Sequence, residues 1–137
     1  MVRSEVIRKR LNKLDQYLSI LYKFQRYRKD EFLEDPEHYG SAERFLQLVI
    51  EAITDIGSHI VADDELGIIN TYSDIPEILA TKGIIDADLK DQWIRMIGFR
   101  NALVHEYVDI DREIVYDVLI NHLAEIEDLK KIFAQFL

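Results

Sequence analysis

The chain has 137 residues, of which 48% are hydrophobic and 31% charged, and this fits one globular domain spanning residues 1–137. It contains no cysteine, which excludes a disulfide scaffold, a thiol nucleophile and a cysteine-bound metal. The formal net charge of −9 argues against a protein that binds polyanions over its whole surface.

The first predicted helix covers residues 3–33 and ends before Pro36. Its apolar residues step by four and three, which is typical of a narrow seam between two helices: Ile7, Leu11, Leu14, Leu18 and Leu21. Residues 1–29 also hold nine Lys or Arg side chains against two acidic ones. This basic stripe either meets phosphate groups or pairs with acidic helices of the same chain, and the sequence leaves both open. The segment has no apolar stretch of the kind that a secretory signal needs.

The second predicted helix runs from Ser41, its expected N-cap, to about Val61, and presents a wide apolar face. Gly57 within this face indicates close approach of another backbone or a local bend. A polar line also follows this helix, since Glu51, Asp55 and His59 recur every four residues. The line is expected to be hydrated or to pair with cations, Arg100 among them. A metal site of a metalloenzyme is the alternative.

The C-terminal half predicts three more helices. Residues 63–73 form a polar connector, and Ser73 is expected to cap a short helix. Asp86 is expected to cap the next helix. The last helix covers about 112–135, with His122 on its apolar face, so His122 is predicted to be a core histidine.

The sequence therefore predicts an all-α bundle of four main helices plus a short one, with antiparallel neighbours. The seam-like first helix favours a homodimer. No apolar run approaches the roughly 18 residues that a membrane span needs, so we expect a cytoplasmic protein without a membrane partner.

The most distinctive stretch lies at residues 98–107 and holds Arg100, His105 and Tyr107. Arginine is a forked cation that fits phosphate, histidine moves protons near neutral pH, and a tyrosine hydroxyl can orient a phosphate or be modified. On an unbroken helix, Arg100 and His105 would point about 140° apart. The chain must therefore bend there, or the partners must come from two chains. A helix C-terminus with dipole-favoured cations is the alternative interpretation.

The run Arg100-Asn101-Ala102-Leu103-Val104-His105-Glu106-Tyr107 matches the Arg-x-x-x-x-His-x-Tyr signature of HepT-type toxins in the HEPN superfamily. The second-helix pattern and Tyr-Ser-Asp-Ile-Pro at 72–76 strengthen the match, so the chain resembles this family over essentially its whole length. The resemblance implies a HEPN-like bundle of four to five helices, a homodimer, and a metal-independent endoribonuclease that needs no cofactor. By position, Arg100 and His105 are the expected catalytic pair, and Asn101 matches a common feature of the motif. Glu51 and Asp55 are expected to support Arg100.

The same resemblance implies a reaction and a partner. Its substrate is RNA, cleaved by 2′-hydroxyl attack into a 2′,3′-cyclic phosphate and a 5′-hydroxyl. His105 would act as general acid or base, Arg100 would stabilise phosphoryl charge, and Tyr107 would position the phosphate. The implied partner is a minimal nucleotidyltransferase (MNT) antitoxin that silences the toxin by AMPylation of Tyr107 and can join it in a larger hetero-oligomer.

Two further alternatives keep the fold and change the activity. In one, the Arg100 and His105 pair binds RNA or a nucleotide without cleaving it. In the other, the chain is the substrate-binding subunit of a nucleotidyltransferase.

Overall fold

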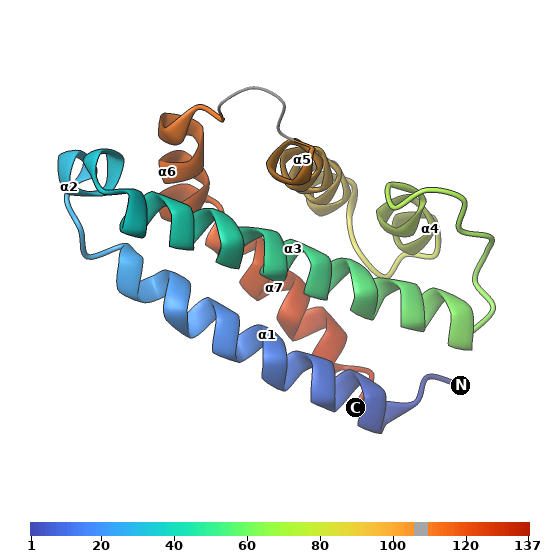
Figure 1. The fold of residues 1–137 in the computed structure, drawn as a ribbon. Helices are drawn as coiled ribbons and strands as arrows, with labels where there is room; N and C mark the ends of the chain where they lie inside the picture. Colours follow the sequence, from blue (N-terminus) through green and yellow to red (C-terminus); the bar gives the residue numbers. More distant parts are fainter. Residues whose placement is uncertain (106–109) are drawn as a thin grey trace.

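A computed structural model describes residues 1–105 and 110–137, and this part of the chain folds into helices without a strand (Figure 1). The predicted all-α class is confirmed. In chain order the helices are α1 (Ser4–Phe24), α2 (Lys29–Glu34), α3 (Pro36–Asp63), α4 (Asp74–Thr81), α5 (Ala87–Val104), α6 (Arg112–Asn121) and α7 (Leu123–Ala134).

Helix α3 lies at the centre of the bundle and contacts every other helix of the described chain. Figure 1 shows α1 and α3 side by side in opposite directions, while α5 crosses α3 near its middle. The five apolar residues of the predicted α1 seam are all buried, which confirms that stripe. Full burial of one such leucine contributes about 1.5–3 kcal/mol, so the seam is a principal source of stability.

The predicted first helix is broken, because α1 ends at Phe24 and α2 begins only at Lys29. Between them Arg28 is extended, and its backbone N–H donates to Glu31 Oε1 at 3.0 Å. The break turns Phe32 into the core, where its ring lies 5.3 Å from that of Tyr116. The sequence did not reveal this change of direction, because no proline or glycine lies between residues 22 and 35.

Helix α3 begins earlier than predicted, at Pro36 rather than Ser41. Asp35 is the true N-cap, since its carboxylate accepts the Glu37 N–H at 2.9 Å. Proline suits the first helical position because its missing N–H would have no partner there. Ser41 lies inside the helix.

The predicted last helix is also broken, at His122, so a core position for this histidine is wrong. Its side chain is 42% exposed, and its two ring nitrogens lie 3.3 Å from Asp117 Oδ2 and 3.2 Å from Glu125 Oε1. The apolar positions of α6 and α7 stay in phase across the break, which is why the sequence reads as one helix. With both breaks, the bundle has more helices than the four to five predicted.

Gly57 allows α4 and α5 to pack tightly on α3. A Cβ atom there would lie 2.7 Å from both Ile75 Cγ2 and Trp93 Cη2. The close neighbours of Gly57 are therefore side chains of α4 and α5 rather than the backbone that we predicted. The buried Trp93 indole N–H donates to Thr54 Oγ1 at 3.2 Å. This contact fixes how α5 sits on α3 and thereby positions the residues further along α5.

Of the two N-caps predicted for α4 and α5, only the second is confirmed by a capping hydrogen bond. Asp86 caps α5 as expected, and its carboxylate accepts the Leu89 N–H at 2.8 Å. Ser73 occupies the N-cap position of α4, but its hydroxyl forms no capping hydrogen bond.

Helix α3 is long and apolar enough to cross a membrane, by length and composition alone. The mean hydropathy of its most apolar 18-residue window is 1.4, and half of that window is buried inside the bundle. The core helix of a globular protein meets the same criteria.

Candidate active site

The C-terminal end of α5 carries the Arg-x-x-x-x-His motif. Arg100 lies in the last turns of the helix, and His105 terminates it, with its backbone N–H donating to the Asn101 carbonyl at 2.9 Å. The helix thus ends where the sequence indicated. Tyr107 lies outside the described residues. Because α5 stays helical through Val104, Arg100 and His105 leave it in different directions.

Arg100 is held by side chains from three elements. Its Nη2 lies 3.4 Å from Glu51 Oε1 on α3, and its Nη1 donates to the neighbouring Asn101 Oδ1 at 3.2 Å. Its guanidinium carbon is 5.8 Å from the ring centre of Tyr72, in the connector before α4. Gln47 donates to the same Glu51 oxygen at 3.0 Å. The side chain of Arg100 is 20% exposed, so the cation is anchored yet reachable.

A cavity of about 300 Å³ opens beside Arg100. Its polar lining comes from α3, the connector and α5: Glu51, Thr54, Asp55, Ser58, Tyr72 and Arg100. His105 is not part of this lining. The structure therefore brings Arg100 together with Glu51, Asp55 and Asn101 but leaves His105 outside the cavity of its own chain.

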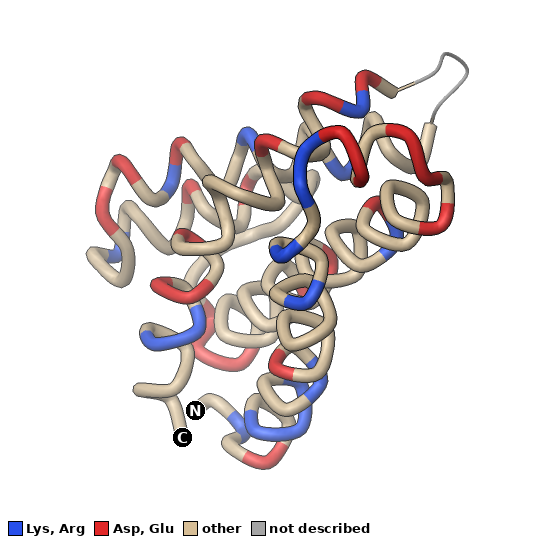
Figure 2. Tube along the Cα trace, turned by 90° about the vertical axis from the view of Figure 1, so that its left-hand side faces the viewer, with Lys and Arg blue, Asp and Glu red and all other residues tan. Residues whose placement is uncertain are grey.

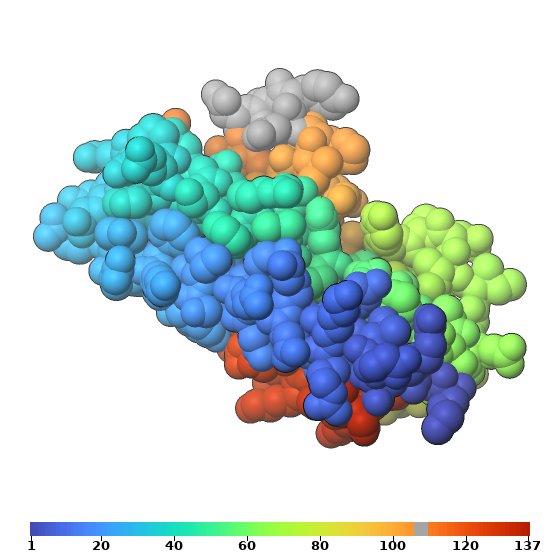
Figure 3. Space-filling view, turned by 60° about the horizontal axis from the view of Figure 1, so that its bottom comes forward, coloured from blue at the N-terminus to red at the C-terminus, as the bar shows by residue number. Residues whose placement is uncertain are grey.

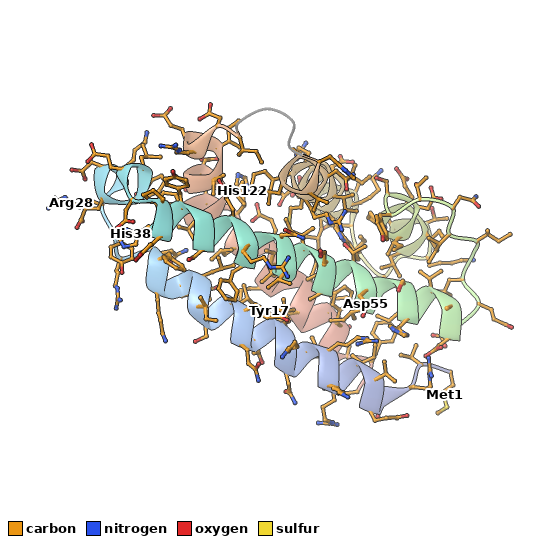
Figure 4. All side chains as sticks on the ribbon, viewed as in Figure 1. Met1, Tyr17, Arg28, His38, Asp55 and His122 are labelled. Carbon is orange, nitrogen blue, oxygen red and sulfur yellow. The ribbon has the colours of Figure 1, made fainter. Side chains whose placement is uncertain are left out.

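A groove of about 460 Å³ lies on the other side of the α3 polar line, between α1 and α3. Lys9, Lys13 and Tyr17 line it from α1, and it shares Glu51 and Asp55 with the cavity. Figure 4 labels Tyr17 and Asp55 on the two helices that bound this groove, and Figure 3 shows α1 flanking α3 across one face. Helix α1, with its Lys and Arg side chains, and Arg100 thus lie on opposite sides of the row of carboxylates that Glu51 and Asp55 form on α3.

The carboxylates of this row are engaged by cations. Glu51 faces Arg100, which confirms the expected pairing, whereas Asp55 Oδ2 lies 2.7 Å from Arg10 Nε on α1. His59 Nε2 is 3.7 Å from Asp55 Oδ1. Within residues 1–105 and 110–137, no three His, Asp or Glu side chains form a cluster suited to a metal ion.

The basic stripe of residues 1–29 also pairs partly with acids of the same chain. In the part of the chain that the structure describes, four of its nine cations form ion pairs: Arg3 with Asp63, Arg10 with Asp55, Arg28 with Asp30 and Glu31, and Lys29 with Glu113. Figure 2 shows Lys and Arg gathered close to the N-terminus, with acidic residues spread over the rest of the chain. Pairing within the chain therefore accounts for part of the stripe. Lys9 and Lys13 line the groove, and their binding to phosphate stays a prediction.

Two site residues were not anticipated as such from the sequence. The apolar stripe indicated which face of α1 is buried, but not which helix it meets or in what register. The sequence therefore gave no sign that Arg10 would pair with Asp55. Tyr72 was noted only within the 72–76 resemblance. That resemblance was the one signal for it.

A family model described as ribonuclease HepT-like matches residues 7–133. A tRNA nuclease HepT of Aphanizomenon flos-aquae is 35% identical over 111 residues, which cover 81% of this chain and 76% of that protein. An mRNA nuclease HepT of Shewanella oneidensis is 37% identical over 82 residues, covering 60% of this chain and 62% of that protein.

Solved structures share the same fold. A tri-AMPylated Shewanella oneidensis HEPN toxin in complex with an MNT antitoxin superposes with a TM-score of 0.88 at 26% identity, covering 95% of this chain and 97% of that one. A toxin–antitoxin complex with AMP-PNP gives 0.89 at 25% identity, with 96% and 98% coverage. YutE of Bacillus subtilis, described as a cytosolic protein of unknown function, gives 0.84 at 22% identity, with 99% and 91% coverage.

Proposed function

This chain belongs to the ribonuclease HepT-like family, and we infer from this membership that it is an endoribonuclease and the toxin of a toxin–antitoxin pair. The observation that carries the inference is the placement of Arg100. A permanent cation, held by Glu51 and Asn101, lines a cavity open to a phosphate, and His105 ends the same helix. The five N–H donors of a guanidinium leave several free to bind phosphate oxygens while two hold the side chain.

The chemistry follows from these two side chains. His105 takes the proton from the 2′-hydroxyl of RNA, or gives one to the departing 5′-oxygen. Arg100 stabilises the negative charge that builds on the phosphoryl oxygens as the 2′-oxygen attacks phosphorus. The 2′-oxygen–phosphorus bond forms and the bond to the 5′-oxygen breaks, so the products carry a 2′,3′-cyclic phosphate and a 5′-hydroxyl.

A homodimer would complete the site. Within one chain Arg100 lines the cavity and His105 does not, and an α-helix separates the two side chains by about 140°. We place the His105 of one copy opposite the Arg100 of the other, in one shared cleft. A catalytic histidine and arginine act on the same phosphate only if they face it together.

Mixed dimers test this arrangement. Arg100→Ala and His105→Ala chains, each inactive alone, are co-expressed with different tags, and the mixed dimer is purified. If the two copies share one cleft, the Arg100 of the His105→Ala copy faces the His105 of the Arg100→Ala copy, and the mixed dimer cleaves RNA. A mixed dimer as inactive as its parents would place both groups within one chain and overturn the shared cleft.

The partner is an MNT-type nucleotidyltransferase, and Tyr107 is the residue that it modifies. The solved Shewanella oneidensis toxin carries AMP groups in complex with such an antitoxin, which supports the assignment. AMP on Tyr107, two residues after His105, would add bulk and negative charge at the site and repel RNA. We also expect the protein to act in the cytoplasm, where RNA and ATP meet.

Co-expression with the nucleotidyltransferase and ATP tests the modification. Mass spectrometry of the purified chain should show whole AMP units on Tyr107 together with loss of RNA cleavage. Tyr107→Phe should gain no mass at this position and stay resistant to silencing. AMP on another residue, or silencing of the Tyr107→Phe chain by modification, would contradict the assignment.

A further inference from the structure

Tyr72 is an exposed aromatic residue beside the motif arginine. It lies in the connector between α3 and α4, the residue is 57% exposed, and its ring centre is 5.8 Å from the guanidinium carbon of Arg100. Large aromatic side chains usually bury their rings, so an exposed one next to a candidate phosphate-binding cation points to a role in binding.

Tyr72 lines two hollows of the surface. One is the 300 Å³ cavity that Arg100 also lines. The other is a hollow of about 450 Å³, whose further polar lining comes from Asn70, Thr71, Ser73 and Asn101. Both hollows include Tyr72, so a ligand that holds its phosphate at Arg100 can place an attached ring against the tyrosine.

The connector holds Tyr72 in a fixed backbone conformation. The Asp74 Oδ2 atom accepts the N–H groups of Asn70 at 2.9 Å and Thr71 at 3.0 Å. The Ile75 N–H donates to the Tyr72 carbonyl at 3.1 Å, and the Ile75 side chain is buried against α3. A preorganised aromatic platform loses less entropy when a ligand stacks on it.

The second hollow has the chemistry of a nucleobase site. Ile69 and Ile97 contribute apolar surface, and the amides of Asn70 and Asn101 offer both donors and acceptors. Bases of single-stranded RNA are recognised in this way, by stacking on an aromatic ring and by hydrogen bonds to the base edge.

We propose that Tyr72 is the stacking platform for an unpaired base of the RNA substrate, next to the phosphate bound by Arg100. The base lies in the hollow with its edge toward Asn70 and Asn101. This inference rests on the proposed ribonuclease function and deepens it, because it makes the preferred substrate a single-stranded segment such as a loop. Bases paired within a duplex are already stacked and cannot enter the hollow.

Binding of a probe that resists cleavage tests the platform separately from catalysis. The probe is a single-stranded 2′-O-methyl oligoribonucleotide carrying 2-aminopurine, a base whose fluorescence changes on stacking. It has no free 2′-hydroxyl and so cannot be cut by the proposed reaction. Wild type should bind it with a fluorescence change, and the same sequence as a duplex should bind more weakly.

Three variants decide the result. Tyr72→Ala should weaken binding by about tenfold or more, the effect of removing one base–aromatic stack, and should abolish the fluorescence change. Tyr72→Phe should keep both. Tyr22→Ala, which removes another exposed tyrosine, on α1, should match wild type.

Wild-type behaviour of Tyr72→Ala would overturn the platform, as would a probe that wild type binds equally well as a duplex. Cleavage of ordinary RNA by the same proteins separates this failure from that of the proposed function. A wild type that cuts RNA alongside a Tyr72→Ala chain that binds normally would refute the platform alone. A Tyr72-dependent stack in a protein that cuts no RNA would refute the ribonuclease and keep the platform.

Discussion

Glu51 and Arg100 lie 49 residues apart in the chain and meet across α3 and α5, with Glu51 Oε1 3.4 Å from Arg100 Nη2. Gln47 donates to the same oxygen at 3.0 Å, so the carboxylate is itself held in place. Both charged side chains are partly buried, and solvent and salt therefore screen their attraction less than at an open surface. The pair links the central helix to the motif and fixes the direction of the guanidinium.

Replacing Glu51 by Gln should lower kcat for RNA cleavage by on the order of tenfold and change KM little. The amide keeps the shape of the side chain but loses the charge that holds Arg100, and small misplacement of a catalytic group is costly. Steady-state cleavage of a fluorescent RNA measures both constants. Glu34→Gln, at an exposed glutamate of α2, serves as the control. An unchanged kcat in Glu51→Gln would show that Arg100 needs no such anchor.

Gly57→Ala should destabilise the fold by about 1–3 kcal/mol, as overpacking of a tight core does. The new methyl group would meet Ile75 and Trp93 at 2.7 Å, and both side chains are buried. Gly40→Ala is the matched control on the same helix, because nothing lies within 4 Å of its added Cβ. That change should stabilise the protein by up to about 1 kcal/mol through helix propensity. Urea unfolding of both variants measures the difference, and equal shifts would contradict the tight packing.

Asp74→Ala should destabilise the connector that carries Tyr72, and the effect should depend on pH. The backbone N–H groups of Thr71 and Asn70 hold the pKa of the Asp74 carboxyl below its usual value. A lowered folded-state pKa gives stability that is fully present above the unfolded pKa of about 4 and is lost as pH falls through the folded pKa. The difference in unfolding free energy between wild type and variant should therefore be constant above about pH 4 and narrow below it. A difference that grew on acidification would contradict these hydrogen bonds.

Lys9 and Lys13 should contribute to RNA affinity through the groove between α1 and α3. The double change of both to Ala should weaken binding equally for RNAs of different sequence. It should also reduce the steepness of log affinity against log salt by about 1.4, because each phosphate contact on a single strand contributes about 0.7 to that slope. Lys29→Ala is the control, since Lys29 pairs with Glu113 at the other end of the bundle. An unaltered slope would place the RNA elsewhere.

Helical periodicity predicted the class of fold and the buried seam of α1, because an apolar stripe must face a partner in water. It could not predict the break at His122, since the apolar positions keep their spacing across it. It also missed the break at Arg28, where no proline or glycine marks the end of the helix. The N-terminus of α3 was misplaced because proline usually breaks a helix, whereas Pro36 occupies the first helical position after the Asp35 cap.

The candidate site also contains some residues that the sequence could predict and others that it could not. A local motif predicted Arg100 and His105 as the candidate pair, and it correctly placed the end of α5 near His105. Four-residue spacing identified Glu51 and Asp55 as one polar line. The contact of Arg10 with Asp55 and the position of Tyr72 beside Arg100 depend on how separate elements pack, and no spacing within one helix encodes that.

Cleavage of RNA by the purified wild-type chain, compared with His105→Ala and the control His122→Ala, tests the central claim most directly. Reactions run in excess chelator, and the ends of the products are analysed. We predict 2′,3′-cyclic phosphate and 5′-hydroxyl ends from wild type and His122→Ala, and none from His105→Ala, which should still bind RNA. Equal cleavage by wild type and His105→Ala, or no cleavage by a wild-type chain whose mass shows Tyr107 free of AMP, would contradict the ribonuclease and favour a binding module.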